Sequence, residues 1–257
     1  MKKYADLWGE MLGTFILVFI GCGSVAVAVL YSPLELWHVA LIWSAGVAIA
    51  IYATKAYCPA HLNPAVSLAM TLAGKSKTSK LLPYVISQFI GAALAAILLF
   101  TLIDSDLQAF ETSKHILRGE ANSYASAVMF GEFFPNPGFE DQLTVSHLQA
   151  CMAEGLGTFT LVLVIFLLTA KPRSFDKLIP ILIGLTVGAI IMVVAPYTQA
   201  GLNPARDFGP RVVAYFTGWK IAAFPAVSWS FLTVYILSPL VGGVAACQLQ
   251  QFFSKNT

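Results

Sequence analysis

A short motif, Asn-Pro-Ala, occurs at residues 63–65 and again at residues 203–205, each time inside an otherwise apolar stretch. Asn is a favoured helix N-cap and Pro is well tolerated at the first helical position, so each copy predicts a helix start. A helix from Pro64 to Gly74 would be about 16 Å long, roughly half of a ~30 Å hydrocarbon core. Two such half-helices would direct positive N-terminal ends at one point and repel cations there. The amides of Asn63 and Asn203 would be free to donate hydrogen bonds to a hydroxyl or to water at that point.

Arg206 is the second residue whose type and position suggest chemistry. It falls in the first turn of the second half-helix, where a cation opposes the helix dipole, and a charge at membrane depth costs at least ~2.5 kcal/mol. The matching position after the first motif is Val66. Helix stability alone would not select this arginine, and we favour a functional role over snorkelling to the surface.

The elements that must position these residues are membrane helices. The chain is 58% hydrophobic and only 11% charged, which is too apolar for a soluble domain of 257 residues. Six apolar runs are long enough to span a bilayer, at residues 12–30, 39–57, 81–103, 151–170, 178–195 and 230–247. The first run has signal-peptide length but no evident cleavage site, so we interpret it as a retained membrane helix.

Basic residues near the span ends indicate the orientation. They fall on one side of a six-span arrangement, which predicts that both termini are cytoplasmic. These residues are Lys2, Lys3, Lys75, Lys77, Lys80, Lys171, Arg173, Lys177 and Lys255. The net charge of +2 resides in these membrane-flanking clusters and gives no indication of a nucleic-acid partner.

The two halves of the chain are related. The segment Gly-Glu-Met-Leu-Gly-Thr-Phe at residues 9–15 recurs as Ala-Glu-Gly-Leu-Gly-Thr-Phe at residues 153–159. Three spans per half is an odd number, so the second half must be inverted relative to the first, with the half-helices approaching from opposite faces. We predict a first repeat over residues 1–105, an external linker loop over residues 106–146 and a second repeat over residues 147–257.

These features together resemble the major intrinsic protein (aquaporin) family. The resemblance is carried by the duplicated Asn-Pro-Ala, by Gly-Thr-Phe near the start of each half, and by Asn-Pro-Ala-Arg-Asp-Phe-Gly-Pro at residues 203–210. It covers essentially the whole chain and is strongest to the aquaglyceroporin, or glycerol facilitator, branch. It implies the aquaporin fold: an all-α membrane protein with six transmembrane helices plus two re-entrant half-helices in inverted repeats.

The same resemblance implies a passive channel for small uncharged solutes, chiefly glycerol. Water would also permeate, urea is a further candidate solute, and protons and ions would be excluded. The resemblance further implies a homotetramer with one pore per subunit in the plasma (inner) membrane, without cofactor, metal or enzymatic activity. A secondary transporter would need titratable or ion-coordinating groups along its path, and an ion channel would need rings of like charges or carbonyls.

The family's selectivity-filter positions correspond to Trp43, Ile191, Ala200 and Arg206, with Arg206 donating to solute and repelling cations. Glycerol facilitators usually carry Trp, Gly, Phe and Arg there, and water-selective aquaporins usually carry Phe, His and a small residue with the Arg. This set is instead similar to the plant nodulin-like intrinsic proteins, some of which also pass neutral metalloid acids. An apolar wall facing a guanidinium suits a polyol. A water-selective channel and a channel for boric or arsenious acid stay open as alternatives.

The resemblance also assigns roles to the loops that precede the half-helices. Glu10 and Glu154 would accept hydrogen bonds from loop N–H groups, which backbone at lipid depth requires, rather than relay protons. His61 would brace its own loop. Backbone carbonyls of both loops would line the pore, from Pro59, Ala60, His61 and Leu62 in the first repeat and from Gln199, Ala200, Gly201 and Leu202 in the second.

Three further expectations concern packing and reactivity. The spacings Gly9-xxx-Gly13 and Gly184-xxx-Gly188 would permit close helix crossings. Asp207 and Arg211 are four residues apart in a helix, which predicts a structural ion pair. Cys58 precedes Asn63 by five residues, which suggests a thiol at the inner vestibule that mercurials could block.

Overall fold

The computed structural model describes residues 4–172, 174–225 and 229–255, and within these ranges every regular element is helical. Lys2, Lys3 and Arg173, which belong to the basic clusters used for orientation, lie outside the described residues. In the described part of the chain, six helices are long and apolar enough to cross a membrane. They are α1 (Ala5–Leu30), α2 (Leu36–Thr54), α4 (Thr78–Ser113), α6 (His147–Leu168), α7 (Ile179–Thr198) and a final span of α9 (Ser230–Leu232), a π-helical turn (Thr233–Leu237) and α10 (Ser238–Lys255).

Two shorter helices begin at the repeated motifs. The first, α3, spans Pro64–Leu72, and the second, α8, spans Pro204–Ala214. The predicted six spans and two half-helices are therefore confirmed. Gly74 follows α3 with a φ of 73°, a left-handed conformation that glycine adopts without strain and that suits a helix end.

The bounds of the helices differ from those of the apolar runs that predicted them: most extend further, whereas α2 and α6 end two to three residues earlier than their runs. The largest difference is at α4, which continues to Ser113. The first eight residues of the predicted linker loop, 106–113, are therefore helical. The rest of this connection is also not plain loop, because it contains a 3-10 turn (Ala121–Ser123) and the short helix α5 (Tyr124–Ala127). Hydropathy marks only the part of a helix that is apolar, whereas the hydrogen-bonded turns of α4 continue into polar sequence.

The two halves pack by matching contacts. Helix α1 packs against α2 and α4, and α6 packs in the same way against α7 and α10. Gly91 of α4 lies so close to α1 that a Cβ atom would overlap the carbonyl of Met11, and Gly242 of α10 lies equally close to the carbonyl of Gly155 in α6. Met11 and Gly155 occupy equivalent positions in the repeated segment, so this packing is what two structural repeats would produce.

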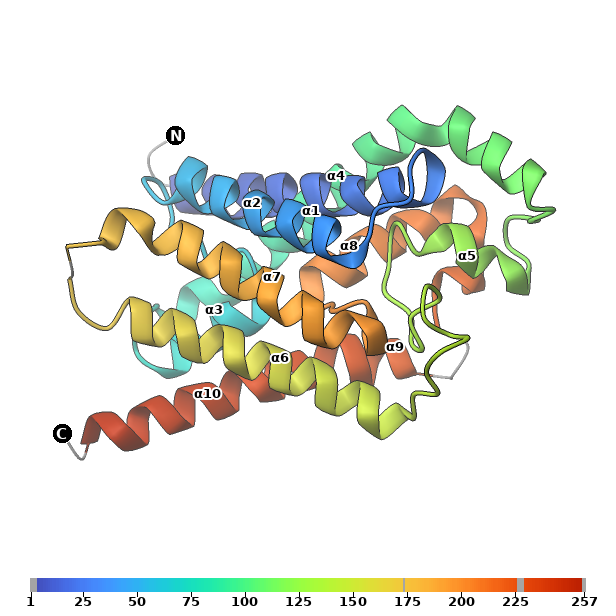
Figure 1. Ribbon diagram of the computed structural model, residues 1–257. Coiled ribbons are helices and arrows are strands. Elements are labelled where there is room, and N and C mark those ends of the chain that lie inside the picture. The colour runs from blue at the N-terminus through green and yellow to red at the C-terminus, as the bar shows by residue number, and fades with distance from the viewer. Residues whose placement is uncertain (1–3, 173, 226–228, 256–257) are drawn as a thin grey trace.

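Both chain termini lie at the same end of the helical bundle (Figure 1). We call this the terminal end; it includes the start of α4, where Lys80 forms an ion pair with Asp6 of α1 (2.6 Å). It also includes the end of α3, where the Leu72 carbonyl accepts a hydrogen bond from Gln251 of α10 (3.0 Å). The opposite end, which we call the loop end, carries α5 and residues 128–146 (Figure 1).

The outside of the bundle is apolar. Each of the six spans exposes large aliphatic side chains, as expected for a surface in contact with lipid rather than water. Examples are Leu12, Leu41, Leu94, Leu156, Leu185 and Val241.

Candidate functional site

The two half-helices begin with side-chain caps, as the sequence predicts. Asn63 Oδ1 accepts a hydrogen bond from the backbone N–H of Ala65 (2.8 Å). Asn203 Oδ1 accepts from the backbone N–H groups of Ala205 (3.0 Å) and Arg206 (3.2 Å). Both asparagines have extended backbone and precede a proline at the first helical position.

The same two asparagines join the repeats. Asn63 Nδ2 donates to the carbonyl of Leu202 (3.0 Å), and Asn203 Nδ2 donates to the carbonyl of Leu62 (2.8 Å). A primary amide has two N–H bonds, so each asparagine retains a second donor after this contact. The starts of α3 and α8 are thereby held together near the centre of the molecule, with a free amide donor from each repeat.

Glu10 and Glu154 brace the loops in an equivalent way. Each of these residues is fully buried. Its carboxylate accepts hydrogen bonds from two consecutive backbone N–H groups in the loop of its own repeat. For Glu10 the donors are His61 (2.8 Å) and Leu62 (2.7 Å), and for Glu154 they are Gly201 (2.8 Å) and Leu202 (2.6 Å). Side-chain donors complete each set, Gln88 Nε2 on Glu10 (2.8 Å) and Thr198 Oγ1 on Glu154 (2.6 Å).

The braced loops hold a backbone that non-glycine residues rarely adopt. Left-handed φ values occur at Ala60 (52°), Leu62 (54°), Gln199 (62°), Ala200 (61°) and Leu202 (56°). Each such residue costs on the order of 1–2 kcal/mol, so the surrounding hydrogen bonds must hold the conformation. In the first loop one further bond does so, because the ring Nδ1 of His61 lies 3.2 Å from Ser67 Oγ.

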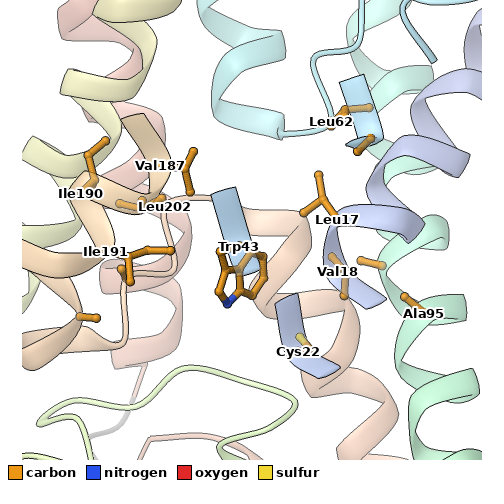
Figure 2. Packing of buried hydrophobic residues seen from close by; sticks show 14 of the residues in the cluster. Leu17, Val18, Cys22, Trp43, Leu62, Ala95, Val187, Ile190, Ile191 and Leu202 are labelled. Atoms are coloured by element: carbon orange, nitrogen blue, oxygen red, sulfur yellow. The ribbon is translucent and has the colours of Figure 1, made fainter. Parts of the chain in front are cut away.

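Two cavities lie along the bundle and meet at the predicted filter. The cavity on the terminal side has a volume of about 310 Å³ and the one on the loop side about 380 Å³. Among the described residues, the two linings share Trp43, Ile191 and Arg206 and no others. In Figure 2 the Trp43 indole projects into the space between Leu17 of α1 and Ile191 of α7. Three of the four predicted filter residues therefore lie where one cavity meets the other, and the fourth, Ala200, lines only the terminal-side cavity.

The remaining predicted pore residues also lie on these walls. The terminal-side cavity is lined by both motif asparagines and by Pro59, Ala60, His61, Leu62, Ala200, Gly201 and Leu202. Gln199 lines the loop-side cavity. The structure thus brings the proposed solute-contacting residues of both repeats onto one path, with Glu10 and Glu154 behind it.

Arg206 has an acidic partner, which the sequence expectation that this arginine repels cations did not include. Its guanidinium carbon lies 4.3 Å from the centre of the Trp43 ring, a cation–π distance. Its Nη1 forms an ion pair with Glu132, and the two residues are only 5% and 2% exposed. The pair is neutral overall, so exclusion of cations has to rest on the half-helix ends and on the cost of stripping water from an ion.

Sequence reasoning missed Glu132 because it lies in the segment predicted to be an external linker. A signal was nevertheless available, since a buried arginine almost always has a charged partner. That linker contains six carboxylates, and nothing local in the sequence selects one of them.

The Asp207–Arg211 pair fixes the segment that carries Glu132. The predicted ion pair is present and fully buried, with Arg211 Nη2 2.5 Å from Asp207 Oδ1. Asp207 accepts from the Glu132 N–H (2.9 Å), and Arg211 donates to the Glu132 carbonyl (2.6 Å). The next residue, Phe133, donates its N–H to the side chain of Gln199 (2.8 Å). A pair that the sequence marked as structural therefore positions a charged group of the filter.

The two pairs of spaced glycines have different neighbours in the structure. Gly184 of α7 does contact another helix closely, since a Cβ there would overlap the Ser44 carbonyl of α2. Gly9 and Gly13 of α1, however, make room chiefly for the segment between α2 and α3. A Cβ on Gly9 would lie 2.7 Å from Cys58 Sγ, and one on Gly13 would overlap Leu62 and lie 3.1 Å from Thr54 Oγ1 at the end of α2.

Cys58 consequently points towards α1. Its Sγ donates to the Thr54 carbonyl (3.5 Å) and accepts from the Ala60 N–H (3.3 Å), and the residue lines neither cavity. The basis for expecting mercurials to block the pore at this thiol is therefore removed.

Six spans, two opposed half-helices and two cavities that meet at a constriction define a pore-forming, integral multi-pass membrane protein. The chain matches the family model described as Major intrinsic protein over residues 1–249 and belongs to that family. It is a passive channel for small neutral solutes and not an enzyme.

Named relatives and a solved structure support this assignment. The chain is 34% identical to the propanediol uptake facilitator PduF of Salmonella typhimurium, over 98% of this chain and 95% of that protein. It is 38% identical to the glycerol uptake facilitator protein of Pseudomonas aeruginosa, over 93% and 85%. The X-ray structure of the aquaglyceroporin from Plasmodium falciparum superimposes with a TM-score of 0.79 at 25% identity, over 95% and 94%.

Proposed function

We propose that the channel conducts small uncharged polyols, chiefly glycerol, together with water, and excludes ions and protons. The observation that carries this proposal is the constriction at Trp43, Ile191 and Arg206, where both cavities meet. Its lining combines two apolar side chains with one paired guanidinium, which contacts the Trp43 ring. A polyol presents carbon to the first and oxygen to the second, so it recovers part of the hydration that it loses on entering.

The departure from the usual facilitator filter supports the same function. Ile191 supplies bulk from α7 at a position that is usually Gly in glycerol facilitators, and Ala200 is small where those proteins usually have Phe. The constriction therefore keeps one bulky apolar group besides Trp43 but takes it from a helix instead of a pore loop. A pore with histidine at the Ile191 position would offer a polar group that favours water.

Beyond the filter, donors and acceptors alternate along the path. Loop carbonyls accept from solute hydroxyls, and the free N–H of Asn63 and of Asn203 donates to a solute oxygen. Because both half-helices present positive N-terminal ends at this point, a cation meets a barrier and an oriented water cannot pass a proton onward.

Stopped-flow light scattering on proteoliposomes tests this function. Fast reswelling in glycerol after osmotic shrinkage, with a low activation energy, is expected; 1,2-propanediol should behave similarly, since a relative is named for propanediol uptake. Urea and boric acid are the comparison solutes. Fast water flow without polyol passage would identify a water-selective channel, and preferential passage of boric acid would identify a metalloid channel. Saturable, gradient-coupled uptake would identify a transporter.

We further propose that the protein lies in the plasma membrane as a homotetramer, with the terminal end of each subunit in the cytoplasm. The family resemblance supports the tetramer, and the basic clusters flanking the spans support the orientation. The molar mass of the detergent-solubilised protein, measured by light scattering, would contradict the tetramer if it corresponded to one chain.

A further inference from the structure

Glu132 has one carboxylate oxygen that no protein group uses. Its Oε1 pairs with Arg206, whereas Oε2 is shielded from solvent and accepts no hydrogen bond from any group in the described part of the chain. The residue lines the loop-side cavity at the filter, beside Arg206. A buried acceptor without a donor costs free energy, and carboxylate oxygens bind donors strongly.

We propose that Glu132 is a specificity-determining residue of the filter, whose Oε2 accepts a hydrogen bond from a hydroxyl of the passing polyol. This inference rests on the proposed polyol-conducting function and names the group that selects the polyol. Arg206 and Glu132 then present a donor and an acceptor side by side. The substrate class that fits them has adjacent hydroxyl groups, of which one accepts from Arg206 and the other donates to Glu132.

This acceptor should matter more to a polyol than to water. At the constriction a polyol touches the apolar side chains of Trp43 and Ile191, which offer its hydroxyl hydrogens no acceptor. Water moves in a hydrogen-bonded file, so its hydrogens are accepted by neighbouring water molecules. Loss of a protein acceptor at this point therefore raises the barrier for the polyol selectively.

The backbone of Glu132 is held in advance of solute arrival. Asp207 and Arg211 bind its N–H and carbonyl, and the next residue is tied to Gln199. A positioned acceptor needs little ordering when the solute arrives, so its interaction contributes more fully to passage.

The Glu132→Gln variant tests the proposal in proteoliposomes. Glutamine keeps the shape and an oxygen that can accept from Arg206, but it replaces the free acceptor by an N–H donor. We expect glycerol and 1,2-propanediol permeability to fall about tenfold relative to water permeability, the effect of losing one hydrogen bond to a charged group. Preserved water permeability shows that the variant pore is folded. The matched control is Glu140→Gln, which changes an exposed carboxylate of the same connection.

An unchanged ratio of polyol to water permeability in Glu132→Gln would overturn the proposal. The role of Glu132 would then be limited to positioning Arg206. Should that variant not fold, Glu132→Asp replaces it: the shorter carboxylate cannot both pair with Arg206 and reach the solute, so the same ratio should fall, and an unchanged ratio overturns the proposal. A wild-type protein without polyol permeability would instead refute the proposed function.

Discussion

At the scale of single residues, the filter combines one neutral ion pair with two apolar side chains. Burying Arg206 alone would be costly, and pairing it with Glu132 keeps the guanidinium in place while cancelling its charge. Selectivity among neutral solutes then depends on shape and hydrogen bonding. Ile191, which is 4% exposed, supplies much of that shape.

Replacement of Ile191 by His should reduce the preference of the filter for polyols over water. The imidazole removes apolar contact with the carbon side of a polyol and adds a polar group for water. We expect glycerol permeability to fall at least about threefold more than water permeability, since losing an aliphatic contact is worth on the order of 1 kcal/mol. Stopped-flow measurement of both permeabilities checks this, with Met192→His, on the exposed side of the same helix, as the control. Equal loss of both permeabilities would contradict the assignment of Ile191 to the filter.

At the scale of elements, the pore loops depend on helices elsewhere in the sequence. Left-handed residues before both half-helices are held by carboxylates on α1 and α6. The equivalence of the two repeats extends to this detail, so each helix bearing a Glu is a scaffold for the loop of its own half.

Glu154→Gln should destabilise the protein through this bracing. The amide can satisfy one of the loop N–H groups but turns its own N–H₂ towards the other, so we expect a loss of about 1–3 kcal/mol. The melting temperature in detergent measures it. Glu10→Gln should lower that temperature to a similar extent, and the exposed control Glu140→Gln should not change it. If Glu154→Gln melted normally yet abolished a pH-dependent proton flux, the proton-relay alternative would replace bracing.

At the scale of the whole molecule, the bundle has two different ends. The terminal end carries the starts of α1 and α4 and the end of α10, and the loop end carries α5 and the segment with Glu132 (Figure 1). The Glu132–Arg206 pair lies nearer the loop end. The orientation of the protein in the membrane therefore determines whether solute reaches the filter first from outside or from inside the cell.

Cysteine labelling determines this orientation. With the half-buried Cys151 replaced by serine, a membrane-impermeant maleimide should label Glu140→Cys at the loop end in intact cells. Lys77→Cys, next to α4 at the terminal end, should be labelled only after the membrane is opened. The reverse labelling pattern would show that the protein has the opposite orientation in the membrane, and the description of the pore would not change.

The sequence by itself determined the parts of this protein that local chemistry controls. A capping Asn followed by Pro starts a half-helix wherever the fold places it, and long apolar runs form spans because lipid leaves the backbone no other partner. The filter positions Trp43, Ile191 and Arg206 followed from their spacing to the motifs through the family resemblance. The structure places them together.

Only the tertiary structure decided which distant groups meet. Glu132 was one of several carboxylates in a segment without hydropathy signal. It lies beside Arg206 because Asp207 and Arg211 bind its backbone and Gln199 binds the N–H of the next residue. The nearest neighbour of Gly9 is likewise Cys58 of the first pore loop. Such pairings arise from the packing of elements far apart in sequence, and local propensity and hydropathy contain no information about them.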